Sequence, residues 1–514
     1  MAASEHHFST DHLLTNLKDR TISSAFVTTI AQGAQFVLTL GSTMVLARLL
    51  SPQDFGLVAM VMTVTGFLRI FKDAGLSTAT VQQHEITQGQ VSNLFWINVA
   101  LSGAITLIVA AAAPLVAWFY REPKLVSITL LLSITFLLTG LTVQHLALLS
   151  RQMRFKDIAV IQVGSLLVGS VVGIAMAWLK YVYWSLVGTQ LAAAISSLVL
   201  VWSISRWRPQ RPTRHSQMWP LLNFGANVSV SNFFYTLARG SDSLLIGRFY
   251  GPASVGLYSR AAALLNSPLQ QFLTPIDAVF VPVLSRLQVE PERYRRTFLQ
   301  AFEAIALITF LFTGLFLVLA EPLTLVVLGP KWDKAAVIFA AFTFAALFYP
   351  FFVTTNWLFA SQRRGRDWLV ASMWVSGLTF CMFLAGLPFG PAGVALFYSL
   401  GGIFLMLPIS FRMAGRSGPV RTVDLWAGFF RQLPVWVIVL GAAGVARLSI
   451  PHFSPLAELC VCFPVGLGAG AAFIYLYGPS LKAFLSLFDA LREWQEKNLR
   501  PLKADPVLTK GVLP

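Results

Sequence analysis

The chain has 514 residues, of which 56% are hydrophobic and only 12% are charged. Soluble globular domains carry about 25% charged residues, so this composition excludes a water-soluble protein and indicates one that crosses a membrane many times. The net charge of +16 does not indicate nucleic-acid binding, because the basic residues are spread over alternate connections between apolar segments and form no single stripe.

Apolar segments follow one another along almost the whole chain. Residues 1–21 lack the apolar core of a secretory signal peptide, so we expect them to form a cytoplasmic tail. Because one crossing needs about 20 apolar residues, the sequence predicts an all-α polytopic membrane protein with about 14 transmembrane helices. The expected spans are residues 22–47, 54–76, 91–119, 125–149, 156–179, 182–204, 219–246, 253–282, 296–320, 335–360, 367–388, 391–411, 425–447 and 456–478.

The positions of the basic residues predict how these spans are oriented. Lys and Arg favour the cytoplasmic side of short loops. If the N-terminus is cytoplasmic, 28 of the 38 basic residues lie on the cytoplasmic side and eight on the opposite side, while Arg239 and Arg260 lie within spans. We therefore expect both termini to be cytoplasmic.

An internal repeat relates the two halves of the chain. Residues 41–57 read "GSTMVLARLLSPQDFGL" and residues 241–257 read "SDSLLIGRFYGPASVGL". At one common offset of 200 positions, the second copy repeats an Arg, a Pro, a Gly and a Leu of the first, namely Arg48/Arg248, Pro52/Pro252, Gly56/Gly256 and Leu57/Leu257. Six spans separate the copies, so both halves enter the membrane in the same direction, as in transporters whose two bundles rock about a central site.

The repeat and the loop charges predict the domain organisation. We expect two parallel six-helix lobes around a central cavity, an N-terminal lobe at 22–206 and a C-terminal lobe at 219–413, joined by a basic cytoplasmic linker at 207–218. Two additional transmembrane helices would occupy 425–478. Apolar residues at helical spacing beside basic ones predict a cytoplasmic amphipathic tail at 479–514.

Polar side chains recur at helical spacing within three expected spans. The first span carries Thr28, Gln32, Gln35, Thr39 and Ser42 on one face. At the offset of 200, Asn232, Tyr235, Arg239 and Asp242 of the seventh span match four of these positions, and the eighth span carries Arg260, Ser267, Gln271 and Thr274 on one face. Because polar stripes facing lipid are costly, we expect them to face an internal, water-accessible cavity.

The charged members of these stripes differ in their possible partners. Arg239 and Asp242 are three residues apart and can pair, which leaves a purely structural reading of both open. Arg260 has no acidic residue three or four positions away, so it is the better candidate for binding an anion. Candidate groups for coupling to an ion gradient are Asp242, Asp277, Glu303 and His145. The chain contains no phosphate-binding loop of the G-x-x-x-x-G-K-[ST] type, and we expect no metal and no cofactor.

Three segments resemble the polysaccharide-repeat-unit flippases, in particular the colanic-acid and exopolysaccharide exporter branch. They are "ARLLSPQDFGLVAM" at 47–60, "RGSDSLLIGRFYGPASVGLYSRA" at 239–261 and "PIDAVFVPVLSRL" at 275–287. The superfamily of these flippases includes multidrug/toxin extrusion antiporters and lipid II flippases. The resemblance implies a non-enzymatic transporter in the bacterial inner membrane. It would flip polyprenyl-diphosphate-linked oligosaccharide from the cytoplasmic to the periplasmic leaflet by alternating access, for exopolysaccharide or O-antigen synthesis.

With that cargo, the polar stripes receive specific roles. Arg binds phosphate oxygens through a planar fork and stays ionised, so Arg239 and Arg260 would attract the diphosphate. Sugar hydroxyls would be bound by Gln32, Gln35, Asn232, Tyr235 and Gln271. Partners would be membrane lipids and the polysaccharide polymerase and export proteins. The alternatives are a cation antiporter or a lipid II flippase on the same scaffold, or, in a different class, a membrane-embedded polysaccharide polymerase.

Overall fold

The computed structural model describes residues 17–69, 77, 80–81, 86–212, 219–450, 453–478, 480–482 and 485. Within these ranges, the side chains of 17–25, 69, 219–239, 272, 275 and 278–279 are not described. Most of the expected N-terminal and C-terminal tails therefore lies outside the described residues.

The described residues form helices and no strands. The first half of the chain contains α3 (Leu17–Leu49), α4 (Pro52–Arg69), α6 (Gln88–Tyr120), α7 (Leu125–Arg151), α8 (Phe155–Trp178) and α9 (Trp184–Ser205). The second half contains α10 (Trp219–Arg286), α11 (Pro291–Val318), α12 (Ala320–Val327), α13 (Asp333–Ala346), α14 (Tyr349–Ser361), α15 (Gly365–Gly386), α16 (Gly390–Gly401) and α17 (Leu407–Ala414). The last helices are α18 (Thr422–Leu448) and α19 (Pro455–Leu476).

The described helices cover the expected spans except for residues 70–76 of the second span, which lie outside the described residues, and the all-helical membrane fold is confirmed. Ten described helices are long and apolar enough to cross a membrane. The seventh and eighth spans are joined in α10 across a sharp kink at Gly251, whose φ of 78° is a left-handed conformation that glycine adopts without a Cβ clash. The expected twelfth span is α16 continued by a π-helical turn, Gly402–Met406, into α17. The protein is therefore a multi-pass membrane protein.

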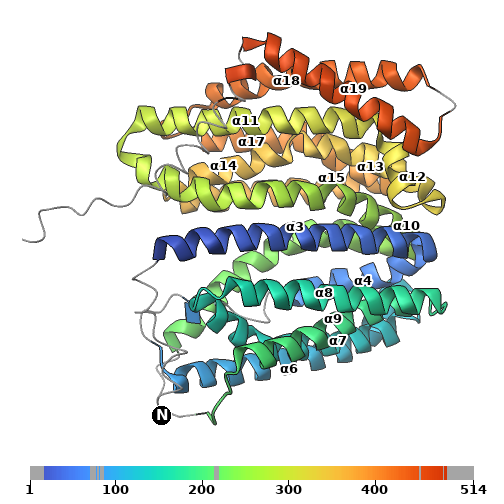
Figure 1. The fold of residues 1–514 in the computed structure, drawn as a ribbon, viewed down its shortest axis with the longest axis vertical. Coiled ribbons are helices and arrows are strands. Elements are labelled where there is room, and N and C mark those ends of the chain that lie inside the picture. Colours follow the sequence, from blue (N-terminus) through green and yellow to red (C-terminus); the bar gives the residue numbers. More distant parts are fainter. Residues whose placement is uncertain are drawn as a thin grey trace, which may run out of the picture.

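The helices form two sets that lie one above the other (Figure 1). We call α3–α9 the N-lobe and α10–α17 the C-lobe. In the N-lobe, α6 packs on α7, and α8 packs on α9 and α3. The largest contact between the lobes is that of α10 with α4, whereas the described part of α10 scarcely touches α3.

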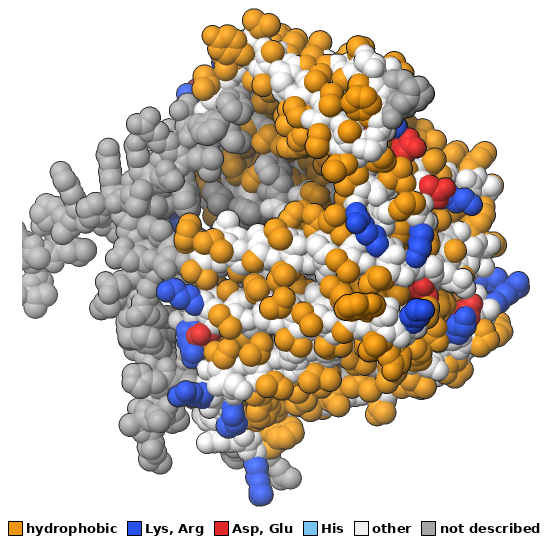
Figure 2. Space-filling model, turned by 45° about the vertical axis from the view of Figure 1, so that its right-hand side comes forward, with side chains coloured by type: hydrophobic (Ala, Val, Ile, Leu, Met, Phe, Trp, Pro, Cys, Tyr) orange, Lys and Arg blue, Asp and Glu red, His pale blue; other side chains and the backbone are white. Residues whose placement is uncertain are grey.

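Apolar side chains cover the middle of the molecule, and charged side chains gather toward its two ends (Figure 2). This is the distribution that a membrane selects, because the hydrocarbon layer admits apolar groups and the headgroup regions admit charged ones. One end of the molecule contains the start of α3, and the other contains the α3–α4 connection and α12 (Figure 1).

The helices α18 and α19 are attached to the C-lobe through α11. The rings of Phe310 and Phe429 meet edge to face with centroids 5.2 Å apart. An ion pair joins Arg295 to Asp424 at 2.5 Å, and another joins Arg431 to Glu303 at 2.6 Å. Since Glu303 is held by this pair, its contacts favour a structural role in fastening α18 to α11.

The described part of the predicted linker lies against the N-lobe. The indole Nε1 of Trp207 donates to Gln88 Oε1 at 2.7 Å, and the indole Nε1 of Trp96 donates to the Gln210 carbonyl at 2.8 Å. The ring of His145 is fully buried beside this part of the linker. Its centroid lies 4.9 Å from that of Trp207 and 4.8 Å from that of Trp202 on α9. His145 thus packs where the linker leaves the N-lobe, and these contacts favour a structural role.

Candidate functional site

Arg260 lies where the two lobes meet, on the part of α10 that follows the Gly251 kink. Its guanidinium carbon lies 5.1 Å from the ring centroid of Phe55, which belongs to α4 in the N-lobe. Its Nε is buried and has no hydrogen-bond partner, and no ion pair joins Arg260 to a carboxylate of the described residues. The side chain therefore offers a positive charge with unused donors, which is the chemistry of an anion receptor.

The polar stripe of α3 is half-buried and partly engaged with the N-lobe. Gln32 and Gln35 are each intermediate in exposure. The amide of Gln35 donates to Gln162 Oε1 on α8 at 3.1 Å. An amide that already forms one such bond keeps further donor and acceptor capacity for a ligand.

The stripe on α10 is described only in part. Asn232, Tyr235 and Arg239 lie in the helical backbone of α10, but their side chains are outside the described residues. Gln271 is exposed, as are Ser267 and Thr274 on the same face. Exposed polar side chains in the middle of a membrane-spanning segment indicate that this face of the helix lines a water-filled space and does not face lipid.

Asp242 lines a cavity inside the C-lobe. The cavity has a volume of about 130 Å³, and its polar lining comprises Asp242, Asn266, Tyr349, Ser376, Thr379 and Tyr398. One carboxylate oxygen of Asp242 accepts a hydrogen bond from the Tyr258 hydroxyl at 2.9 Å, and the other accepts one from the Ser243 amide. Sequence spacing alone could not reveal this cavity, because its lining comes from helices that are more than 100 residues apart in the chain, as Asp242 and Tyr398 are.

Asp277 lies apart from this cavity. Its carboxylate accepts a hydrogen bond from the indole Nε1 of Trp357 on α14 at 2.5 Å, and it does not belong to the cavity lining. This contact favours a role in holding α10 against α14.

The lobes close tightly against each other at the end that contains the α3–α4 connection, which we call the closed end. A Cβ placed on Gly56 would overlap the Pro252 carbonyl oxygen, and a Cβ placed on Gly256 would overlap the Pro52 carbonyl oxygen. This reciprocal contact is the arrangement expected of two lobes related by the 200-residue repeat. Only glycine permits two backbones to approach so closely.

A second contact at the closed end comes from the turn Pro330–Trp332. The indole Nε1 of Trp332 donates to the Ala47 carbonyl at 2.9 Å, and the Lys331 ammonium donates to the Arg48 carbonyl at 3.1 Å. The Arg48 guanidinium in turn donates to the Val326 carbonyl at 3.0 Å. These bonds satisfy carbonyl groups at the C-terminal end of α3 with donors from the other lobe. No pattern in the sequence pointed to this turn.

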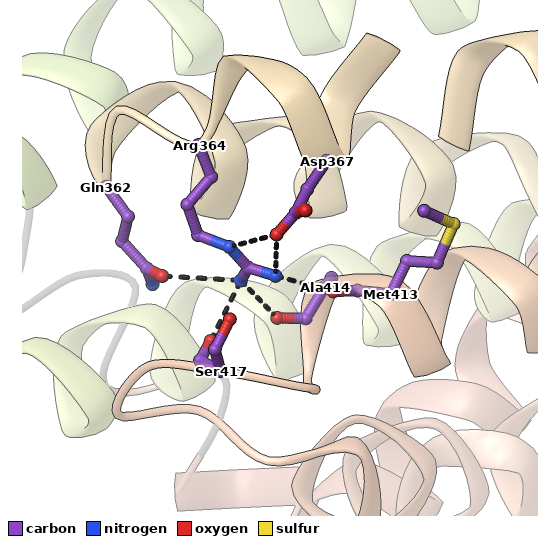
Figure 3. Close-up of polar contacts among 6 residues, drawn as sticks. All are labelled: Gln362, Arg364, Asp367, Met413, Ala414 and Ser417. Atoms are coloured by element: carbon purple, nitrogen blue, oxygen red, sulfur yellow. Dashed lines mark hydrogen bonds and ion pairs between the residues drawn. The ribbon is translucent and has the colours of Figure 1, made fainter. Parts of the chain in front are cut away.

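At the opposite end, an Arg ties neighbouring helices of the C-lobe together (Figure 3). The Arg364 guanidinium donates to Asp367 at 2.8 Å. It also donates to the carbonyls of Met413 at 2.7 Å and of Ala414 and Ser417 at 2.8 Å. One side chain thereby binds the start of α15 to the end of α17 and to the segment that leads to α18.

The N-lobe contains a looser copy of this turn. Arg154 pairs with Asp157 at 2.5 Å and donates to the Ile204 carbonyl at the end of α9 at 3.4 Å. The preceding residues, Met153 and Arg363, have left-handed φ values of 54° and 56°. The shared pattern Gln-x-Arg-x-x-Asp at 152–157 and 362–367 is the signal by which the sequence could have shown this second repeat.

We expect Arg364→Ala to destabilise the protein more than Arg154→Ala. The Arg364 side chain is 12% exposed and that of Arg154 is 37% exposed. Losing a buried, charge-assisted hydrogen-bond cluster costs about 2 kcal/mol, whereas an exposed pair contributes below about 1 kcal/mol. Thermal unfolding of the purified variants measures the difference, and an equal loss in both would contradict the asymmetry.

Comparison with known proteins places this geometry in a family. The family model described as polysaccharide biosynthesis protein matches residues 45–337. The chain is 26% identical over 470 residues to the teichuronic acid biosynthesis protein TuaB of Bacillus subtilis, covering 90% of this chain and 94% of TuaB. It is 28% identical over 309 residues to the succinoglycan biosynthesis transport protein ExoT of Rhizobium meliloti, covering 60% of this chain and 62% of ExoT. Over 325 residues it is 24% identical to the lipopolysaccharide biosynthesis protein WzxC of Escherichia coli, covering 62% of this chain and 65% of WzxC.

Solved structures show the same fold. The lipid II flippase MurJ in an inward closed conformation has a TM-score of 0.66 at 14% identity, covering 88% of this chain and 99% of MurJ. An inward-facing multidrug resistance MATE family transporter of the MOP superfamily has a TM-score of 0.56 at 15% identity, covering 78% of this chain and 96% of the transporter. With the family match extending over more than half of its length, the chain belongs to the polysaccharide biosynthesis protein family, and it shares its fold with these two solved structures.

Proposed function

We propose that this protein is a transporter that flips polyprenyl-diphosphate-linked oligosaccharide repeat units from the cytoplasmic to the periplasmic leaflet of a bacterial inner membrane. The observation that carries the proposal is Arg260, a guanidinium between the lobes whose buried Nε has no hydrogen-bond partner and which no described carboxylate neutralises. Relatives named for teichuronic acid, succinoglycan and lipopolysaccharide biosynthesis support a polysaccharide precursor as the cargo.

The diphosphate is the part of this cargo that most needs a protein. A charged group pays a large desolvation cost in hydrocarbon, and a guanidinium between the lobes replaces its lost hydration. In the proposal, Arg260 and Arg239 bind the diphosphate, while Gln32, Gln35, Asn232, Tyr235 and Gln271 bind sugar hydroxyls. Half-exposed amides on α3 and the exposed Gln271 support such a polar path.

The lipid tail requires a lateral opening between the lobes. It can stay in the bilayer while the head group crosses only if two helices separate enough to let it pass. The described part of α10 packs along α4 but scarcely against α3, which supports an opening on the α3 side.

The charge distribution supports a cytoplasmic location of both termini. With that orientation the closed end faces the periplasm, and alternating access would require the contacts of Gly56, Gly256 and Trp332 to break in each cycle.

Asp242 is the candidate for coupling to an ion gradient. It lines the C-lobe cavity together with hydroxyl and amide groups, whereas Asp277 and Glu303 are engaged by Trp357 and Arg431. A polysaccharide polymerase and export proteins are the proposed partners, since they would consume the flipped repeat unit.

Deleting the gene in its native cell is expected to cause lipid-linked oligosaccharide to accumulate on the cytoplasmic leaflet, because the precursor is still made but no longer crosses. Mass spectrometry of the lipid-linked pool, with rescue by the intact protein, measures this. Intact surface polysaccharide without any accumulation would contradict the proposed cargo and direct attention to small-molecule export on the same scaffold.

A further inference from the structure

Phe55 of the N-lobe contacts two groups of the C-lobe. Its ring centroid lies 5.3 Å from that of Trp332 in an edge-to-face geometry of 79°. Its face receives the Arg260 guanidinium at 5.1 Å. Phe55 is only 5% exposed and Trp332 is fully buried, so water does not separate these groups.

This aromatic contact belongs to the closed end itself. Phe55 directly precedes Gly56, whose backbone meets Pro252 of the other lobe. Trp332, which meets the Phe55 ring edge to face, donates to the Ala47 carbonyl at the end of α3. The same ring thus contacts both the candidate anion receptor and a residue that joins the two lobes.

An anion at Arg260 weakens the hold of the ring on the guanidinium. A guanidinium over an aromatic face is held by the ring quadrupole, whereas phosphate oxygens offer charge-assisted, bidentate hydrogen bonds that are considerably stronger. The unpartnered Nε of Arg260 is available for such a bond. The negative charge of a bound anion opposes that of the guanidinium and so weakens the attraction of the ring quadrupole, which loosens one of the C-lobe groups that hold Phe55.

We propose that Phe55 is a positioning residue that couples anion binding at Arg260 to opening of the closed end. This proposal rests on the proposed function, since it takes Arg260 as the receptor for the diphosphate. By linkage, a ligand that binds better when the Phe55–Arg260 contact is broken shifts the population toward the state in which the lobes have separated there. The cargo head group would thus itself favour the opening through which it leaves.

The test follows the accessibility of one cysteine behind the closed end. Met60 on α4 is fully buried, and its side chain lies beside Gly247 of the other lobe. Met60→Cys is introduced into a chain whose three native cysteines are replaced, and its labelling by an impermeant maleimide is timed with and without inorganic diphosphate. With Phe55 present, we expect diphosphate to raise the labelling rate at least about threefold, a shift of roughly 0.65 kcal/mol in opening.

Two substitutions at position 55 separate coupling from simple packing. Phe55→Leu keeps an apolar side chain but removes the ring, so labelling should be fast and insensitive to diphosphate. Phe55→Tyr keeps the aromatic face and should restore the diphosphate response. In a double-mutant cycle, Arg260→Met should accelerate labelling when Phe55 is present and have no further effect in the Phe55→Leu background.

The outcomes distinguish this inference from the proposed function. Binding of diphosphate, measured separately by calorimetry, without a change in labelling would overturn the coupling and leave Arg260 as the receptor. A diphosphate response that persists in Phe55→Leu would also overturn it. If diphosphate does not bind, or binds equally well to Arg260→Met, both the coupling and the proposed receptor are wrong.

Discussion

Arg260→Ala is expected to lower transport at least tenfold while leaving the thermal stability of the protein unchanged or raised. A bidentate pair with phosphate contributes about 1.5–3 kcal/mol, and each 1.4 kcal/mol corresponds to about a factor of ten in affinity. Arg260→Lys should retain part of the activity, because an ammonium keeps the charge but lacks the planar fork.

The expected stability effect separates a functional Arg260 from a structural one. An Arg within a membrane span costs about 2.5–3.5 kcal/mol on insertion scales, and its contact with the Phe55 ring returns about 2 kcal/mol. Removing the side chain should therefore not destabilise the fold. Arg286, exposed in the last turn of the same helix, supplies the matched control, and Arg286→Ala should transport normally.

Transport is measured by rescue of the deletion strain and stability by thermal unfolding of the purified protein. Full rescue by a stable Arg260→Ala protein would remove the basis of the proposed function. A parallel fall in stability and transport would instead assign Arg260 to the architecture of the lobe interface.

Gly56→Ala is expected to reduce transport about tenfold by preventing closure. The added methyl group would overlap the Pro252 carbonyl, and forcing extra atoms into a close-packed contact costs about 1–3 kcal/mol. By the repeat, Gly256→Ala should act in the same way through Pro52. Both variants should expose the closed end to an impermeant maleimide at Met60→Cys, because the lobes can no longer approach fully.

The same helix offers a matched control for this substitution. A Cβ on Gly66 of α4 would have no neighbouring atom within 4 Å. Both exchanges gain about 1 kcal/mol of helix propensity, so Gly66→Ala should keep normal transport and slow labelling. Equal behaviour of Gly56→Ala and Gly66→Ala would show that the close approach of the lobes is dispensable.

Much of the fold was determined by patterns that are local in the sequence. The apolar runs predict the membrane helices because a bilayer imposes a length and a polarity on every span, whatever its neighbours are. The repeat at Gly56 and Gly256 was visible for a similar reason, since each copy is contiguous in the chain. Arg260 could be singled out because an uncompensated charge in an apolar run is costly before any tertiary contact is known.

Tertiary structure alone decided which of these residues meet. Phe55, Trp332 and Arg260 come from three distant parts of the chain, and no local pattern predicts their contact. For Glu303 and Asp277, local sequence left an ion-coupling role open, and the partners Arg431 and Trp357 favour structural roles. The physical reason is that the cost of a buried charge can be read from its own segment, whereas the group that compensates it is chosen by packing between helices.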